Sequence, residues 1–292
     1  MVVSDFVGKS ASPIVVWGSA LALSLVTPFG SQARAEPVGP SDSQCVVNPN
    51  NVVTCSGNLL AGVHIDSDAD DSVDYETLYL RDLIGHAGED DDVIHIMSEP
   101  GRAGIFFRNS RDNADILLEG DPTGILLDVG EPDSGGIIIL ANENSGKVTL
   151  NYWGNTRANE SYGVYIKAAE VVMDYFGDIE TVGQGSSHNH GIYVKGASAE
   201  GHLLQVKHQG TITTKGGHGH GIYVIGENAN HIRIERAGEI EVTGESSIGI
   251  FSITGDNLDG VGGNIFIENV FLLILFHFKL KVEKFSIFNF QN

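Results

Sequence analysis

Basic residues are scarce in this chain of 292 residues, which holds 17 Lys and Arg against 38 Asp and Glu. The formal net charge is −21 at pH 7. Residues 1–35 carry +1 and residues 270–292 carry +2, which leaves −24 for residues 36–269. Because a surface this acidic repels phosphate groups, nucleic acids and anionic membrane surfaces are excluded as partners.

The chain also has few cysteines and little helical periodicity. The two cysteines are Cys45 and Cys55, and no histidine lies beside either in the sequence, which argues against a nucleophilic or metal-binding thiol. No stretch of the chain after residue 35 combines a helical period with helix caps. Helical repeats are therefore excluded as well.

The N-terminal region has the pattern of an export signal. Residues 13–29 form a short apolar stretch, and the small-residue site Ala33-Arg34-Ala35 follows it. We therefore expect cleavage after Ala35, although the n-region is weak because Asp5 offsets Lys9. The alternative is a transmembrane helix, which the length of the apolar run and the cleavage pattern disfavour.

Two short phrases recur along the chain. The first, Gly-Ile-Tyr-Val and close variants, begins at Gly163, Gly191, Gly221 and Gly249, at intervals of 28, 30 and 28 residues. The second, Gly-x-Ile followed by Thr or Val two residues later, begins at Gly177, Gly210 and Gly238. Repeats of this length indicate a solenoid, a propeller or an array, and a propeller blade needs about 40 residues. The phrases therefore predict one β-helix coil per repeat, with equivalent strands paired in parallel about 4.8 Å apart.

Weaker copies extend the array upstream. Gly104-Ile-Phe-Phe and Gly136-Ile-Ile-Ile continue the first phrase, and residues 114–120 and 147–151 take the place of the second. About seven coils then fit between residues 77 and 269. The alternative is an ordinary β-sandwich with accidental similarity.

Within each first phrase the glycine predicts a corner where the backbone turns sharply or takes a positive φ. Ile192 and Ile222 head the strands that follow, so we assign them to the core and assign Tyr193 and Tyr223 to the outer face.

Cys45 and Cys55 flank the turn Asn48-Pro-Asn-Asn between two Val-rich strands. They can therefore face each other across a hairpin, and an oxidising compartment would join them. Such a hairpin would cap the first coil, whose edge is otherwise open to pairing.

These features together resemble the pertactin-like passengers of autotransporters, the β-helical proteins of type V secretion in Gram-negative bacteria. The signal, the short hairpin that begins at Cys45 and ends in Val-Thr-Cys-Ser-Gly, and the Gly-Ile-Tyr-Val coils carry the resemblance over residues 1–269. It implies an exported passenger, at the outer membrane, the cell surface or outside the cell, that is often adhesive. It implies no catalytic residue and no cofactor. Its partners would be molecules on host or neighbouring cells, or a second copy of the chain.

The chain departs from this family at its end, where such proteins carry a translocator barrel. Residues 270–292 are an aberrant hydrophobic tail with six of the 13 Phe, too short for a barrel, so contact with the outer membrane would need a barrel missing from this chain. We interpret the tail as out-of-frame translation of a truncated gene. The alternatives are a genuine terminal strand or a wrongly assembled fragment.

Histidines and carboxylates are the remaining candidates for chemistry. His188, His190, His218 and His220 precede two consecutive first phrases, so stacking could bring four imidazoles to one corner as a Zn, Cu or Ni site. Polar filling of a Gly-rich turn is the alternative. Residues 66–74 and 89–92 are acidic clusters that could hold calcium loosely, but the first lacks the Gly at the sixth position and the Glu at the twelfth position of an EF-hand loop. A solvated acidic face is the alternative there.

A β-helical polysaccharide lyase or hydrolase is the competing functional class. It needs carboxylates that converge in a groove, and no spacing forces convergence of the six available ones, Asp112, Asp115, Asp128, Asp174, Asp178 and Glu180.

The sequence thus predicts an all-β protein, a right-handed parallel β-helix with an N-terminal disulfide hairpin cap. The expected organisation is a signal peptide at 1–35, a cap at 36–76, passenger coils at 77–269 and the tail at 270–292. The expected function is a non-enzymatic adhesion or interaction scaffold without a cofactor.

Overall fold

The computed structural model describes most of the chain between residues 39 and 269. The described residues are 39, 42, 44–59, 61–69, 74–83, 95–96, 102–122, 124–129, 135–183, 189–196, 202–226, 231–254 and 265–269. All of them belong to one of the two compact units of the chain, residues 34–292. The predictions for the signal peptide, the cluster 89–92, His188 and the tail 270–292 lie outside the described residues.

The first phrase of the repeat forms a sheet of seven parallel strands, because each copy pairs with the copy before and after it. In order along the sheet these strands are β3 (Val63–Asp66), β6 (Ile105–Asn109), β9 (Ile137–Ala141), β11 (Val164–Ala168), β14 (Ile192–Gly196), β17 (Ile222–Gly226) and β20 (Ile250–Thr254). We call this the seven-stranded sheet.

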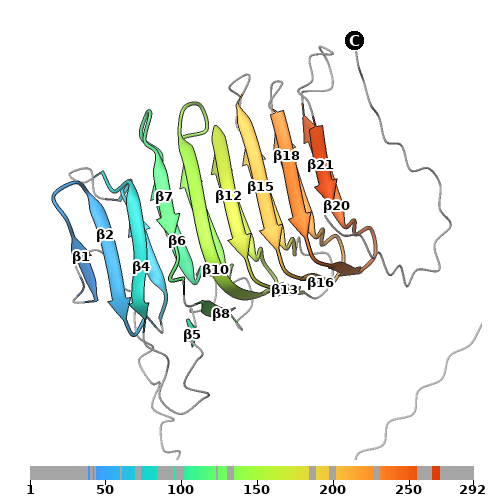
Figure 1. Ribbon diagram of the computed structural model, residues 1–292, viewed down its shortest axis with the longest axis horizontal. Coiled ribbons are helices and arrows are strands. Elements are labelled where there is room, and N and C mark those ends of the chain that lie inside the picture. Colours follow the sequence, from blue (N-terminus) through green and yellow to red (C-terminus); the bar gives the residue numbers. More distant parts are fainter. Residues whose placement is uncertain are drawn as a thin grey trace, which may run out of the picture. The chain divides into compact units, whose positions relative to one another are not determined.

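The remaining strands form a second sheet of 14 strands, whose longer path is seen in Figure 1 as the succession from β1 to β21. That path contains β1 (Cys45–Val47), β2 (Val52–Gly57), β4 (Thr77–Leu83), β7 (Ile116–Glu119), β10 (Lys147–Asn159), β12 (Glu170–Phe176), β15 (Leu203–Gln209), β18 (His231–Ala237) and β21 (Ile265–Asn269). The C-terminal half of β10 joins a branch of shorter strands, β5 (His95–Ile96), β8 (Ile125–Val129), β13 (Ile179–Val182), β16 (Ile212–Lys215) and β19 (Ile240–Thr243).

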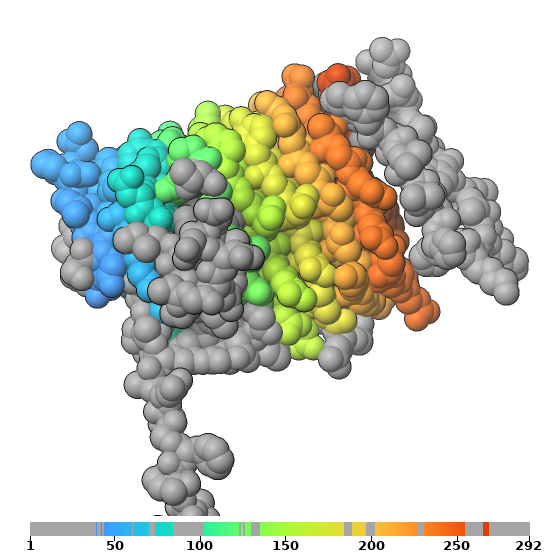
Figure 2. Space-filling view, turned by 60° about the horizontal axis from the view of Figure 1, so that its bottom comes forward, coloured from blue at the N-terminus to red at the C-terminus, as the bar shows by residue number. Residues whose placement is uncertain are grey.

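The described part of the chain is therefore all-β, with parallel pairing throughout except between β1 and β2. It contains no helix among the described residues, and hence none with the length and apolarity to span a bilayer. Each full repeat contributes one strand to the seven-stranded sheet and two to the other. Successive repeats follow one another in order along the stack (Figure 2), an arrangement consistent with a β-helical solenoid.

Alternation of side chains along each strand builds the core. Ile192 pairs with Ile222, and both are completely buried, as predicted. Tyr193 pairs with Tyr223, and both are partly exposed on the outer side, also as predicted. The same alternation holds in β12, where Val171, Met173 and Tyr175 are buried. The inward rows of Ile, Val and Leu from successive coils form one hydrophobic core.

The corner glycines are required by close packing between coils. A Cβ on Gly191 would lie 2.6 Å from the carbonyl oxygen of Gly221, and one on Gly163 would lie 2.6 Å from that of Gly191. Positive φ occurs instead at the glycines of the second phrase, with 146° at Gly177 and 135° at Gly210. Of the two reasons predicted for the first-phrase glycines, the sharp turn is present as a bend at Gly163, Gly191 and Gly221, whereas a positive φ is not, and close packing is a further reason.

Two further predictions are modified by the pairing. Residues 116–119 and 147–151 align with β12, not with the second phrase, because β7 and the first half of β10 pair in the longer path of the 14-stranded sheet. Parallel pairing also begins upstream of residue 77, since β2 pairs with β4 and β3 pairs with β6. The region 36–76 thus supplies strands to the first coil in addition to the hairpin.

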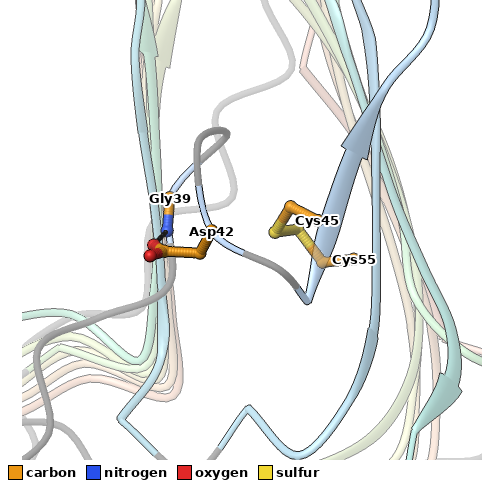
Figure 3. The surroundings of a disulfide bond; sticks show 4 residues. All are labelled: Gly39, Asp42, Cys45 and Cys55. Atoms are coloured by element: carbon orange, nitrogen blue, oxygen red, sulfur yellow. Dashed lines mark hydrogen bonds between the residues drawn. A yellow bond between two sulfur atoms is a disulfide. The ribbon is translucent and has the colours of Figure 1, made fainter.

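The disulfide between Cys45 and Cys55 is present and joins β1 to β2 (Figure 3). The two residues are direct partners in the antiparallel pair, and both are buried, with the Cα atoms 4.0 Å apart. Beside the bridge, the amide of Gly39 donates to Oδ2 of Asp42 at 2.6 Å. The bond therefore fixes β1 against β2, its neighbour on the longer path.

Removing this bridge should destabilise the protein moderately. The loop that it closes is short, with a sequence separation of 10, so the loss expected for Cys45→Ser/Cys55→Ser is roughly 2–3 kcal/mol in the free energy of unfolding. Urea unfolding of the double variant and of the oxidised wild type measures it. An unchanged urea midpoint would show that β1 does not stabilise the stack.

A row of polar side chains lies inside the stack where β12 and its equivalents approach the corner. Tyr152, Tyr175 and His208 are completely buried and pair in register, and Arg236 follows with 4% exposure. The Tyr175 hydroxyl donates to Oγ1 of Thr156 at 2.8 Å, and Nε2 of His208 lies 3.0 Å from the carbonyl oxygen of Gly177. Burial lowers the pKa of His208 to about 4. The imidazole is therefore neutral at physiological pH.

This row predicts a loss of stability in mild acid. The unfolded chain binds a proton at His208 near pH 6.5, whereas the folded chain does so only near pH 4, so stability is lost as the pH falls through this window. Between pH 7 and pH 5 the loss due to His208 should be about 2 kcal/mol. His208→Tyr, which repeats the residue of the two preceding coils, should abolish this part of the loss. An identical pH dependence of the urea midpoints of wild type and variant would contradict it.

Candidate functional site

The outer side of the seven-stranded sheet carries a continuous row of aromatic and aliphatic side chains. Register places one such residue on each strand, so that neighbouring coils present it side by side. In order along the stack the row consists of His64, Phe106, Ile138, Tyr165, Tyr193, Tyr223 and Phe251. We call it the outer aromatic row, and its four C-terminal members are all partly exposed.

The three tyrosines of the row are stacked face to face. The ring centroids of Tyr165 and Tyr193 are 5.1 Å apart with planes 9° from parallel, and those of Tyr193 and Tyr223 are 5.1 Å apart at 15°. The ring of Phe251 then packs against Tyr223 at 4.9 Å and 73°. Because neighbouring rings cover each other's faces, the tyrosines direct their edges outward. The three tyrosines therefore present their ring edges outward at regular intervals.

A second row flanks the aromatic one at the corner that precedes each strand. It consists of Tyr162, His190 and His220, which immediately precede the corner glycines. The ring of Tyr162 lies 5.6 Å from that of His190, and the rings of His190 and His220 lie 5.0 Å apart at 9°. His190 also meets Tyr193 edge-on at 5.4 Å. The corner row thereby supports the tyrosines from one side.

Backbone hydrogen bonds fix the tautomer of these histidines. The amide of His220 donates to Nδ1 of His190 at 3.0 Å, and the amide of Ile248 donates to Nδ1 of His220 at 3.0 Å. The hydrogen-bond network thus assigns the ring proton of each neutral imidazole to Nε2, which is then a donor. In this form the ring nitrogens offer no lone pair to a metal ion.

Of the other members of the predicted metal site, His218 lies in the turn before the corner row and His188 lies outside the described residues. His218 is an exposed turn residue with a φ of 57°, and the placement of His188 is not described. Within the described ranges, no three His, Cys, Asp or Glu side chains are grouped as a metal site would require. His190 and His220, which the structure does place together, pack against the tyrosine rings and accept hydrogen bonds from backbone amides.

Beyond the aromatic row, the same face carries basic and aliphatic side chains. Some of them line a shallow hollow. Its volume is about 410 Å³, and Arg108 and Lys167 line it together with acidic and amide groups. Arg108 donates to Asp66 at 2.6 and 2.8 Å, and Lys167 pairs with Glu143. Burial raises the pKa of the Asp68 carboxyl, but hydrogen bonds from Ser110 and the charge of Arg108 outweigh it and lower that pKa. The charged groups of the hollow thus neutralise one another.

The described carboxylates of the acidic cluster at residues 66–74 interact with different partners. Asp66 and Asp68 turn toward Arg108, and Asp74 accepts a hydrogen bond from Asn109 at 2.6 Å. The other carboxylates of this segment lie outside the described residues. The described part of the cluster therefore pairs with cationic and amide groups.

The six carboxylates considered for glycoside chemistry lie on different parts of the stack. Asp112 accepts from Asn142, and Asp115 accepts from the amide of Lys147. Asp174 lies 3.6 Å from Lys207 on the 14-stranded sheet. Asp128, Asp178 and Glu180 lie on or beside the branch of short strands, where Glu180 pairs with Lys215 at 2.7 Å and Asp178 accepts from the amide of Thr211. They do not converge on one groove.

No protein-family model, curated protein or solved structure matches this chain. The candidate site therefore rests on the geometry of the outer aromatic row. Sequence reasoning had placed Tyr193 and Tyr223 outside, but it missed the continuation of the row to His64 and its support by Tyr162. The available signal was the third residue of each first phrase, which is aromatic in all but one copy from Gly104 onward.

Proposed function

We propose that this chain is the N-terminal passenger part of an autotransporter-like protein of a Gram-negative bacterium, acting as a non-enzymatic adhesion or interaction scaffold. Residues 1–35 direct export, and the mature chain is displayed at the cell surface. Its partners are molecules on host or neighbouring cells, or a second copy of the chain.

The outer aromatic row is the observation that carries this proposal. Tyrosine supplies a large, rigid and amphipathic contact area, and it is enriched where proteins meet their partners. Here Tyr165, Tyr193 and Tyr223 are held in register on the outside, and they are not part of the hydrophobic core. A solenoid that repeats an outward tyrosine in three consecutive coils presents an extended contact surface.

The proposal also includes the right-handed coil and the N-terminal cap, each of which has its own support. A right-handed coil follows from the strong preference of parallel strand connections for that hand. A cap at the N-terminal edge is supported by β1, which reverses direction and covers β2 under the Cys45–Cys55 bond. The lyase or hydrolase alternative gains no such support, because the candidate carboxylates do not converge on one groove and Asp174 and Glu180 each pair with a lysine.

The experiment is production of the full chain in a Gram-negative host with its own leader. We expect the exported protein to begin at Glu36 and to carry no free thiol, as N-terminal sequencing and thiol labelling would measure. Beads coated with this protein should adhere to at least one of a panel of epithelial and bacterial cells, or to each other, more than albumin-coated beads do. Uncleaved protein in the inner membrane, or adherence no greater than that of albumin, would overturn the proposal.

A further inference from the structure

We propose that the outer aromatic row binds a neutral linear polysaccharide that runs along the stack with one sugar per coil. This inference rests on the proposed function and names its ligand class. It follows from the period of the row, the orientation of its rings and the net charge of the molecule.

The period of the row suits a polymer with a short repeat. Tyr165, Tyr193 and Tyr223 are related by two equal steps of 5.1 Å, which parallel pairing of the strands fixes. An extended chain of β-1,4-linked hexopyranoses with equatorial linkages advances by a distance close to this spacing for each sugar. Successive sugars would therefore meet the same groups on successive coils.

The orientation of the rings disfavours a protein partner and suits a hydroxyl-rich one. Energetic hot spots in protein interfaces are anchors that project into a pocket of the partner. The three tyrosines cover each other's faces, so they form an even surface of ring edges in which no single side chain projects as an anchor. Their phenol groups both donate and accept hydrogen bonds, which matches sugar hydroxyl groups.

The net charge of the molecule favours a neutral glycan over an acidic one. The chain as a whole carries −21, which repels polyanions at a distance. On the central strands β11 and β14, the outward positions are Tyr165, Lys167, Tyr193 and Lys195, with no acidic side chain among them. Lys167 is neutralised by Glu143. The tyrosines thus lie beside outward positions that hold no acidic side chain, in a molecule that is strongly acidic as a whole.

The test is affinity electrophoresis of the full exported chain in native gels that contain a soluble polysaccharide. The neutral β-linked probes are mixed-linkage glucan, galactomannan and xyloglucan, and the comparison gels contain dextran, alginate or no polysaccharide. We expect retardation by at least one neutral β-linked probe and at least a tenfold weaker apparent affinity for Tyr193→Ser/Tyr223→Ser. Affinity for oligomers of that probe should rise with length until four sugars span Tyr165 to Phe251.

The matched control is Phe176→Ser. Phe176 is a partly exposed aromatic residue on the 14-stranded sheet, where it stacks on Trp153 at 5.8 Å, so its loss should leave retardation unchanged. Unfolding of the tyrosine variants is checked by their urea midpoints. If these fall, Tyr193→Phe/Tyr223→Phe keeps the packing and should still weaken binding severalfold, because only the hydroxyl groups are lost.

Three results would overturn the inference. They are retardation by none of the neutral probes, retardation by alginate alone, and retardation that the tyrosine variants and Phe176→Ser share equally. A dimer of the wild type that the tyrosine variants lose, without retardation, would assign the face to a second copy. In that case bead adherence would persist, and the proposed scaffold function would stand while the glycan class failed.

Discussion

Ile192→Asp or Ile222→Asp is expected to lower the free energy of unfolding by roughly 4 kcal/mol or to prevent folding altogether. Both side chains are completely buried and lie directly above one another in consecutive coils. A carboxylate at either position would face Ile and Val from neighbouring coils, with no described cation in the core cluster to pair with it. The cost is therefore that of a buried, unpaired charge.

Adjacent valines in β12 provide the matched control. Val171 is completely buried, whereas Val172 is partly exposed on the outer side of the same strand. Val171→Asp should destabilise as severely as Ile192→Asp, and Val172→Asp should cost about 1 kcal/mol or less. Urea unfolding followed by circular dichroism measures both. Equal losses for the two valine variants would mean that the assignment of inner and outer faces is wrong.

Gly210→Ala is expected to have an effect of similar size through the backbone. A Cβ at this position would lie 2.2 Å from the carbonyl oxygen of Gly177 in the preceding coil, and the φ of 135° is one that side chains rarely adopt. The same oxygen accepts the hydrogen bond of His208, so relief of the clash would also disturb the interior polar row. The two coils would have to separate locally.

Gly124→Ala separates the effect of φ from that of the clash. Gly124 has a φ of 96°, and a Cβ there would meet nothing within 4 Å among the described surroundings. Its replacement should cost about 1–3 kcal/mol from backbone strain alone. Gly210→Ala should cost clearly more in the same urea assay. A loss for Gly210→Ala equal to that for Gly124→Ala would show that the coils are not packed this closely.

The repeating strands could be predicted because their chemistry is nearly constant from coil to coil. Ile192 and Tyr193 recur as Ile222 and Tyr223, since an inward ladder of Ile and an outward ladder of Tyr each favour the same residue in the next coil. The corner glycines recur for the same reason, as each lies against the next. The Cys45–Cys55 bond was also predictable, because a Pro-Asn turn places the two cysteines opposite each other.

Sequence reasoning missed the strand that lies between the first and the second phrase of each coil. The outward residues of this strand differ from coil to coil. In β12, β15 and β18, the pattern of alternate burial is regular, but the aligned outward residues Asp174, Lys207 and Glu235 share no chemistry. Inward positions of these strands also include His208 and Arg236, which sequence reasoning does not assign to a core. Their burial is decided by hydrogen bonds between coils that only the register reveals.

The measurement that tests the account most directly is adherence of beads coated with the exported chain when the outer aromatic row is altered. Tyr193→Ser/Tyr223→Ser should reduce adherence at least tenfold at equal coating density and unchanged fold, while Phe176→Ser should leave it at the wild-type level. Undiminished adherence of the tyrosine variant, or an equal loss in both variants, would contradict the claim that this face is the contact surface of the scaffold.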